Sequence, residues 1–335
     1  MVVHKVVFHA VSAARSHAPM NSHSSAALST IVIPVFNRGD LLRGVLEGLT
    51  KQSLPTSSFE VLVCDDGSTE SLAPVVADYS DALPHLQHLR QPNKGPAAAR
   101  NLGIVHAQTD VILFLDSDVV PGHDVVRGLT AALLHHSEWQ GAEARLEPTG
   151  GEDSFGWDAP RSDTGGHYHT AGIAYRKTVL EEIGGLDENF SRAACEDVEL
   201  AYRVLQHGPI GFVPDAVVYH PRRRRTAASC WKARKNWRYV QLLACRHGFL
   251  GWPGNKTTSP RLRTAVCAAI TLPAGRVIEA LRRVPVAPAD AFRGLALAAI
   301  DWLGGLVMVP TILLAPVPPH RSQVGPSGQL VESGR

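Results

Sequence analysis

The sequence predicts an α/β fold with a mainly parallel central sheet and helices on both of its faces. Short apolar segments of strand length alternate with segments of helical periodicity through the first two thirds of the chain, which is typical of parallel strand–helix–strand units. Three of the apolar segments end in Asn or Asp residues. Open α/β sheets bind ligands at the carboxyl ends of their strands, so these residues predict a site along one sheet edge.

Apolar runs and their spacing define the elements of the amino-terminal part. The predicted strands are residues 30–36, 59–64, 86–90 and a segment that ends at Asp116, and the predicted helices are 40–50, 72–79 and one that opens at Pro96. Residues 112–115 are all apolar, as in a strand buried on both faces. Proline suits the first turn of a helix, where its missing N–H removes no hydrogen bond.

The following part mixes helices, short strands and one long loop. We predict helices at 125–135, 176–183 and 196–206, strands at 170–175, 210–213 and 216–220, and a loop at 148–169. The loop is rich in Gly, Asp and Ser, and we expect it to lie over the ligand site. Gly184-Gly185 ends the helix at 176–183, because glycine accepts the backbone angles of a helix end.

Two carboxylates, Asp116 and Asp118, follow the strand at the centre of this pattern. Residues i and i+2 of an extended chain point to the same side, so both carboxylates could bind one divalent cation with a ligand's phosphates. In isolation the pair is equally consistent with two solvated aspartates that open the loop before Pro121. The chain has neither a Gly-x-Gly-x-x-Gly after the first strand nor a phosphate-binding Gly-x-x-x-x-Gly-Lys-Ser/Thr, which argues against a dinucleotide-binding domain and a P-loop ATPase.

Six short motifs occur in a characteristic order. They are Pro34-Val35-Phe36-Asn37-Arg38, Asp65-Asp66-Gly67-Ser68, Asn93-Lys94-Gly95-Pro96-Ala97-Ala98-Ala99-Arg100-Asn101, Asp116-Ser117-Asp118, Gly184-Gly185-Leu186-Asp187-Glu188 and Glu196-Asp197. Over residues 29–221 the chain resembles the family 2 glycosyltransferases, an inverting family with the GT-A fold of nucleotide-diphospho-sugar transferases. The resemblance implies a nucleoside-diphosphate sugar as donor and Mg²⁺ or Mn²⁺ as cofactor.

The resemblance also implies roles for particular residues. The donor-binding residues are Pro34, Asn37, Asp66, Lys94, Arg100 and Asp116. Among them, Asp66 would accept a hydrogen bond from the base, backbone near Pro34 would line the base pocket, and Lys94 and Arg100 would meet the base or diphosphate. Asp116 would hold the ribose or sugar. Asp118 would bind the metal, with Asp116 and His220 as further ligands, and Asp197 would be the general base.

Each of these residues also has a plain structural interpretation. Acidic residues in a first helical turn stabilise the helix dipole, which would account for Asp197. His220 could be a hydrogen-bonded histidine at a strand end, and Lys94 and Arg100 could be solvated surface residues. The Gly184–Glu188 motif is expected to be structural, a helix end that shapes the acceptor side.

The carboxyl-terminal third is basic and then apolar. Residues 221–247 hold nine Lys/Arg and no Asp/Glu, which suits an anionic membrane surface, an anionic substrate or a solvated helix face; nucleic acid ranks last, because no nucleic-acid module precedes the segment. Residues 295–318 are almost wholly apolar around Asp301 and Pro310. We expect a hydrophobic helix pair, with 264–275 as its other member, that packs on the domain or lies in a membrane interface.

The predicted organisation is a disordered leader at 1–28, a GT-A domain at 29–221, a helical region at 222–320 and a disordered tail at 321–335. Whether the chain starts at Met1 or Met20 is left open. The five cysteines form no Cys-x-x-Cys pair, which favours a cytoplasmic protein with reduced thiols, peripheral at the inner face of the membrane.

The predicted function is a metal-dependent hexosyl- or pentosyltransferase that moves one sugar from a nucleoside-diphosphate sugar, expected to be a UDP-sugar, to an acceptor hydroxyl. Processive relatives carry Gln-x-x-Arg-Trp, whereas this chain has Asn236-Trp237-Arg238-Tyr239. The acceptor could be a lipid-linked glycan, a natural product or a protein. The alternatives are a nucleotidyltransferase of related fold, which would show a Gly-rich loop after its first strand, and a non-catalytic sugar-nucleotide-binding scaffold, which would need neither Asp118 nor Asp197.

Overall fold

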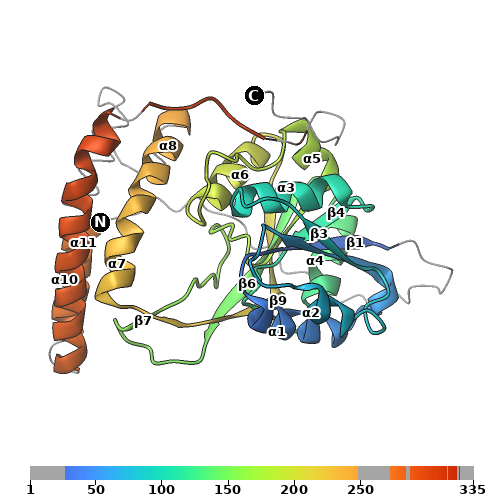
Figure 1. The fold of residues 1–335 in the computed structure, drawn as a ribbon, viewed down its shortest axis with the longest axis horizontal. Coiled ribbons are helices and arrows are strands. Elements are labelled where there is room, and N and C mark those ends of the chain that lie inside the picture. Colours follow the sequence, from blue (N-terminus) through green and yellow to red (C-terminus); the bar gives the residue numbers. More distant parts are fainter. Residues whose placement is uncertain (1–26, 248–271, 284–286, 315, 323, 325–335) are drawn as a thin grey trace.

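A computed structural model describes residues 27–247, 272–283, 287–314, 316–322 and 324 of the chain (Figure 1). The predicted leader therefore lies almost wholly outside the described residues, and so does most of the apolar segment 264–275. Two regions are visible: an α/β domain, and a layer of helices on one side of it.

In the part of the chain that the structure describes, one mixed sheet of eight strands forms the centre of the α/β domain. Its strands are β1 (Ser29–Val35), β2 (Phe59–Asp65), β3 (Leu86–Arg90), β4 (Val111–Phe114), β5 (Val120–Pro121), β6 (Gly141–Thr149), β8 (Ile173–Arg176) and β9 (Ile210–Pro221). Their order is β3-β2-β1-β4-β8-β6-β9-β5. Strands β1 to β4 pair in parallel, as do β6 and β9, whereas β8 runs antiparallel to both its neighbours and β5 runs antiparallel to β9. The predicted α/β fold with a mainly parallel sheet is confirmed.

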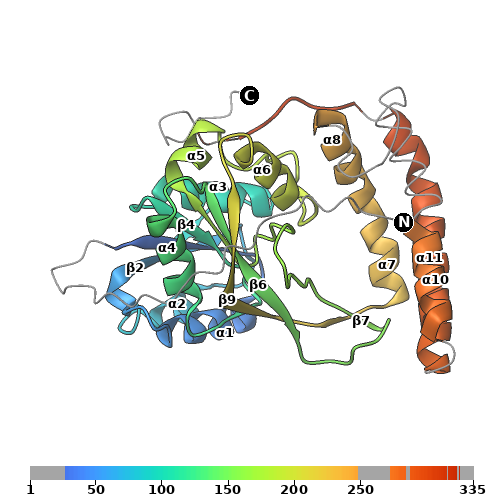
Figure 2. The ribbon, with the colours of Figure 1, turned by 180° about the vertical axis from the view of Figure 1, so that it is seen from behind.

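Helices cover both faces of this sheet (Figures 1 and 2). The helices of the domain are α1 (Gly39–Thr50), α2 (Ala73–Ala77), α3 (Pro96–His106), α4 (Val125–His135), α5 (Lys177–Glu182) and α6 (Glu196–Val204), with a one-turn 3₁₀ helix at Thr56–Ser58. Alternate side chains of β1 enter separate cores, because Ile31 packs in the core that contains α1 and α4, and Val32 packs in the core that contains α3 and α6. Burial of both strand faces explains the continuous apolar runs.

Strand β6 was not predicted from the sequence. Its residues, Gly-Ala-Glu-Ala-Arg-Leu-Glu-Pro-Thr, include few with a preference for strands, but β8 and β9 pair with it on either side. The two short strands predicted at 210–213 and 216–220 form the single strand β9, whose pairing with β6 shifts in register between Ala144 and Arg145. Tertiary pairing therefore overrides local preference in this half of the sheet.

Among the described residues, the carboxyl-terminal layer contains α7 (Ala227–Ala233), α8 (Trp237–His247), α10 (Leu272–Arg283) and α11 (Pro288–Leu314), with a 3₁₀ turn at Arg234–Asn236. A two-stranded sheet of β7 (Trp157–Asp158) and β10 (Arg223–Arg224) joins this layer to the domain (Figure 1). Helix α11 packs against α7, α8 and α10. A segment from 289 to 312 in α11 is long and apolar enough to cross a membrane by length and composition.

The described residues after α11 contact the α/β domain. Of the tail predicted to be disordered at 321–335, only residues 321, 322 and 324 are among them. The carbonyl oxygen of Arg321 accepts a hydrogen bond from the Glu188 N–H at 2.7 Å, and Val324 is buried in the core beside α3 and α6. These contacts lie next to the Gly184–Glu188 motif. Gly184 and Gly185 have φ angles of 76° and 67° and end α5 as expected.

Candidate active site

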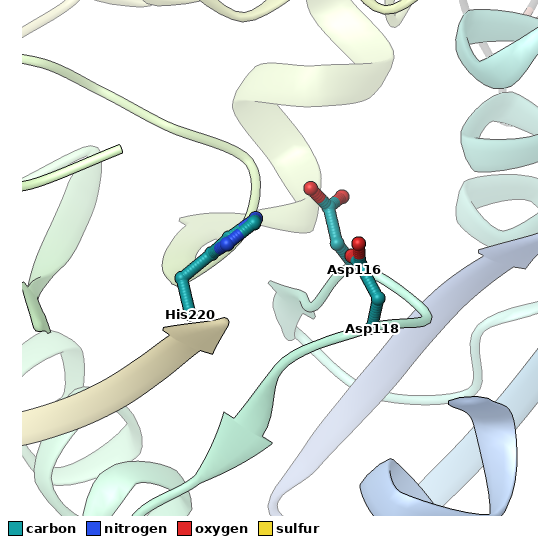
Figure 3. Close-up of side chains that lie close together, drawn as sticks. All are labelled: Asp116, Asp118 and His220. Carbon is teal, nitrogen blue, oxygen red and sulfur yellow. The ribbon is translucent and has the colours of Figure 1, made fainter. Parts of the chain in front are cut away.

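Two carboxylates and one imidazole converge at the edge of the sheet (Figure 3). Asp116 and Asp118 lie in the loop after β4, and His220 comes from the end of β9. One ligand atom from each lies within 4.8 Å of those from the other two. The Nδ1 atom of His220 is 3.1 Å from the Pro221 carbonyl oxygen. A carbonyl can only accept, so Nδ1 is the donor in this contact, and Nε2 is the ring atom that could bind a cation.

Two arginines contact the same oxygen of Asp118. Nη1 of Arg38, from the start of α1, lies 2.9 Å from Asp118 Oδ2, and Nη2 of Arg223, from β10, contacts that oxygen as well. The Asp118 side chain is 2% exposed. A buried carboxylate requires such compensation, because burial disfavours its charge. Neither arginine was singled out as a site residue from the sequence.

Arg100 connects the carboxylate cluster to the start of α6. Its side chain is buried, with Nη2 2.7 Å from Asp116 Oδ1 and Nη1 3.2 Å from Glu196 Oε1. Burial opposes its charge, but Asp116 and Glu196 outweigh that effect and raise the pKa of Arg100. Arg100 is therefore an organising residue of the site and not a solvated helix residue. Its ion pairs bring Asp116 close to the Glu196-Asp197 pair.

Asp197 lies at the start of α6, where it faces the long loop. The residue before this pair, Cys195, has a left-handed φ of 68°, a conformation that costs energy for a non-glycine residue and is often found at functional sites. Asp197 Oδ1 accepts a hydrogen bond from the Val198 N–H at 2.8 Å, and Oδ2 lies 3.4 Å from His169 Nδ1. Burial alone would lower the pKa of His169, but the hydrogen bond and charge of Asp197, together with Glu143 and Asp116, raise it.

A buried glutamate on β6 holds the loop that carries His169. Glu143 accepts hydrogen bonds from the N–H groups of Gly166, His167 and Tyr168 at 2.7 to 3.2 Å and from the Ser162 hydroxyl at 2.9 Å. The loop predicted at 148–169 thus reaches the site as expected. Neither Glu143 nor His169 was predicted, because the strand that carries Glu143 was missed and a single histidine in a loop gives no signal.

The remaining predicted donor residues line the neighbouring strand ends, and much of their hydrogen bonding is within the protein. The buried Asp66 carboxylate accepts from the N–H groups of Lys94 and Gly95 at 2.9 and 2.8 Å and from Gln91 Nε2 at 2.8 Å. The Lys94 side chain is exposed. Asp66 thereby fixes the loop before α3, and a carboxylate with about four acceptor positions can still bind a base.

Asn37 and Pro34 lie at the end of β1. Asn37 has a left-handed φ of 52°, which asparagine tolerates better than most residues. Its side-chain oxygen accepts from the Thr69 N–H at 2.7 Å and from the Thr69 hydroxyl at 3.0 Å. Pro34 is half-buried opposite Cys64 of β2. The predicted donor residues of β1, β2 and β4 therefore share one edge of the sheet.

Comparison with known proteins connects this site to a family. Residues 30–138 match the family model described as Glycosyl transferase family 2. The chain is 33% identical over 228 residues to a pre-mycofactocin glycosyltransferase of Mycobacterium tuberculosis, which covers 62% of this chain and 45% of that protein. It is 29% identical over 232 residues to a validoxylamine A glucosyltransferase of Streptomyces hygroscopicus subsp. limoneus, covering 57% and 51%. The chain thus spans about half the length of these relatives.

Solved structures resemble the whole arrangement. The mannosyltransferase PcManGT from Pyrobaculum calidifontis, in complex with GDP-Man and Mn²⁺, superposes with a TM-score of 0.56 at 16% identity, covering 84% of this chain and 86% of that one. TarS of S. aureus in complex with UDP-GlcNAc gives a TM-score of 0.53 at 17% identity, covering 87% and 81%. At these identities the likeness shows the fold alone, and the fold is that of GT-A transferases. The segment that matches the family model builds β1 to β4 and the aspartates at their ends, so the likeness to glycosyl transferase family 2 includes the carboxylates of the candidate site.

Proposed function

We propose that this protein is an inverting, metal-dependent glycosyltransferase that moves one sugar from a nucleoside-diphosphate sugar to an acceptor hydroxyl. One observation carries the proposal: Arg100 joins the cluster of Asp116, Asp118 and His220 to the start of α6, where Asp197 lies. A cation-binding cluster and a candidate base thus flank one site. The GDP-Man and UDP-GlcNAc in similar solved structures support a nucleotide sugar as donor.

The ligand atoms that Asp116, Asp118 and His220 offer suit a divalent cation. Carboxylate oxygens are ligands for Mg²⁺ and Mn²⁺, and the imidazole of His220 adds one nitrogen. Asp116, Asp118 and His220 would hold the ion. When bound, it supplies positive charge to the leaving diphosphate. Arg38 and Arg223, which lie at Asp118, add further positive charge at the place where the leaving group develops negative charge.

Asp197 performs the proton transfer in this proposal. The acceptor oxygen forms a bond to the anomeric carbon as the bond from that carbon to the diphosphate oxygen breaks, and the hydroxyl proton passes to Asp197. The nucleoside diphosphate leaves with the electron pair, and attack from the opposite face inverts the anomeric configuration. The amino end of a helix favours the ionised form of a carboxylate, so Asp197 is suited to accept a proton.

The test is a panel of nucleotide sugars incubated with the purified protein, Mn²⁺ and candidate acceptors, with nucleoside-diphosphate release as the readout. Chelator should abolish release and added Mn²⁺ or Mg²⁺ should restore it, and NMR of the product should show the inverted anomer. Full turnover after thorough chelation would contradict the role of the metal. A nucleotidyltransferase would instead release pyrophosphate from a nucleoside triphosphate and sugar phosphate.

We also propose that the outer face of α11 binds an anionic membrane surface. Eight of its exposed residues form an apolar stripe, namely Phe292, Ala296, Ala299, Leu303, Leu306, Val307, Pro310 and Leu314, and Ala289, Arg293 and Trp302 are exposed as well. At 3.6 residues per turn the stripe spans roughly 100° of the helix. The opposite side packs inward, where Gly304 approaches Trp231 and Ile312 packs on Trp237. An apolar face on the far side of a packed helix marks an interaction surface.

The charge of the neighbouring helices supports a lipid surface as the partner of this stripe. The helices of the same layer expose Lys232, Lys235 and Arg238, and exposed cations attract anionic headgroups while apolar residues enter the interface. The protein should float with anionic vesicles, and salt should release part of it. The double variant Leu303→Glu, Leu306→Glu should weaken flotation at least about tenfold. Each of these leucines, once buried in the membrane interface, would stabilise binding by about 1.5 kcal/mol or more. Leu41→Glu, at an exposed leucine of α1, is the matched control.

The competing partner for the stripe is a second copy of the chain. Light scattering after gel filtration distinguishes the two. A dimer that the Leu303→Glu, Leu306→Glu variant dissociates, with no flotation of the wild type, would contradict membrane binding.

A further inference from the structure

The run Arg222–Arg225 was ambiguous in the sequence, and the structure gives its four side chains different surroundings. Arg222 donates a hydrogen bond from Nη1 to the Gly150 carbonyl at 3.0 Å. Arg223 contacts Asp118, Arg224 is exposed, and Nη2 of Arg225 lies 3.2 Å from Asp301 of α11. Arg223 is thus the member of this run that contacts the cluster of Asp116, Asp118 and His220.

The backbone around Arg223 is fixed on both sides. The Arg222 N–H donates to the Thr149 carbonyl at 2.8 Å, and the Arg225 N–H donates to the Gly156 carbonyl at 2.7 Å. Between them, β10 pairs with β7, with Arg223 opposite Asp158. The side chain of Arg223 is nevertheless 55% exposed. A fixed backbone with a solvated, flexible side chain allows the guanidinium to change partners while it stays at the site.

The contacts at Asp118 cannot all persist when a cation binds. Arg38, Arg223 and the cation would compete for one buried carboxylate, and Oδ2 already accepts from Arg38 Nη1 and contacts Arg223 Nη2. Like charges within a few Å repel each other strongly where water is excluded. Burial, and then the neighbouring charge of Arg38, lower the pKa of Arg223, whereas the charge of Asp116 raises it.

We propose that Arg223 exchanges partners during donor binding: it pairs with Asp118 in the free enzyme and moves to the diphosphate of the donor when Asp118 ligates the divalent cation. The inference rests on the proposed function, since it needs a cation at Asp118 and a diphosphate beside it. A guanidinium matches phosphate oxygens in a bidentate geometry. Arg223 therefore competes with the cation before the donor arrives and neutralises the diphosphate afterwards.

This exchange predicts two effects of opposite sign for Arg223→Gln. Binding of Mn²⁺ alone, followed by the electron paramagnetic resonance signal of free Mn²⁺, should become roughly 2- to 5-fold tighter, because a partly exposed ion pair of up to about 1 kcal/mol no longer competes. Binding of UDP at saturating Mn²⁺, measured by calorimetry, should become roughly 10-fold weaker, because a charge-assisted contact to phosphate is lost. Neither measurement requires turnover.

Arg224→Gln is the matched control. It removes the same charge from the same strand at an exposed position, so it should change both affinities less than about twofold, apart from long-range effects that salt screens. Arg223→Lys is the second variant, since it keeps the positive charge. It should bind Mn²⁺ alone about as weakly as the wild type and lose part of the UDP affinity, because an ammonium cannot form the bidentate contact.

The outcomes separate the inference from the function on which it rests. If Arg223→Gln weakens Mn²⁺ and UDP binding together, Arg223 has a structural role and the exchange is wrong. If it changes neither, the contact with Asp118 is a surface ion pair without function and the exchange is also wrong. A wild type that binds neither Mn²⁺ nor UDP, while thermal denaturation shows it folded, would instead overturn the proposed function.

Discussion

Replacement of Asp197 by Asn tests the proton transfer most directly. The substitution keeps the size of the side chain, and Asn can still accept the 2.8 Å hydrogen bond from the Val198 N–H. It removes the charge that faces His169 at 3.4 Å. Because both side chains are partly exposed, the loss of this contact should cost no more than about 1 kcal/mol of folding stability. The variant should therefore fold like the wild type.

Catalysis should respond far more strongly than stability. A positioned general base contributes about 10²- to 10⁴-fold, which corresponds to roughly 3–5.5 kcal/mol of activation free energy. We expect kcat for nucleoside-diphosphate release to fall by about this factor, whereas UDP affinity at saturating Mn²⁺ should change little, because Asp197 is assigned to the acceptor side. Asp118→Asn should lose UDP affinity as well. Turnover of Asp197→Asn within a few-fold of the wild type would refute the assignment.

Glu196 is the nearest alternative base, and its contacts argue against that role. Its Oε1 lies 3.2 Å from Arg100 and its Oε2 accepts from the Ala194 N–H at 2.7 Å. Burial, and then the charge of Asp197, raise the pKa of Glu196 to about 7. Both oxygens are thus engaged inside the protein. Glu196→Gln should lower the free energy of unfolding by about 1–3 kcal/mol, since it weakens the contact to a buried arginine, and this loss of stability distinguishes it from Asp197→Asn.

Three further predictions concern the surroundings of the site. Because the pKa of His169 is raised, its ion pair with Asp197 should stabilise the fold fully below about pH 6.5 and lose that effect as the pH rises through the raised pKa; denaturant unfolding of His169→Gln across this range should show a flatter pH dependence. Glu143→Gln should weaken the hold on residues 166–168 and expose this segment to faster hydrogen exchange, with α1 unchanged as an internal control. Gly103→Ala would place a Cβ 2.3 Å from Val32 Cγ1 and should lower stability by about 1–3 kcal/mol, measured by thermal unfolding.

The amino-terminal half of the fold was predictable because its signals are local. The predicted strand at 86–90 and helix at 125–135 agree with β3 and α4, and each apolar run of β1, β2 and β4 is buried on both faces. Strand β6 gave no such signal, since Ala142 and Ala144 are buried through pairing with strands far away in the sequence. Its absence from the prediction also concealed Glu143 and thereby the anchor of the long loop.

The candidate site was predictable where residues follow strand ends and unpredictable where they come from loops. Asp116, Asp118 and His220 do lie together, as the topology of parallel strands implies. The contacts of Arg38 and Arg223 with Asp118 depend on how α1 and β10 are placed around the loop after β4. The basic and aromatic stretch was equally ambiguous, because packing decides its use: Tyr239 is buried against Phe190.

Residues 222–225 connect the two regions that the sequence presented separately. Arg223 and Arg225 lie two positions apart on one short extended segment, and they contact Asp118 in the candidate site and Asp301 in α11. The segment is held by backbone hydrogen bonds to Thr149, at the end of β6, and to Gly156 in the long loop. A helix α11 that binds a membrane through its outer face would also contact, through Asp301 on its inner face, the segment from which the Arg223 guanidinium reaches Asp118. In this arrangement one short segment connects the helix of the apolar stripe to the candidate site, and attachment to a surface would constrain the backbone of Arg223 relative to Asp118.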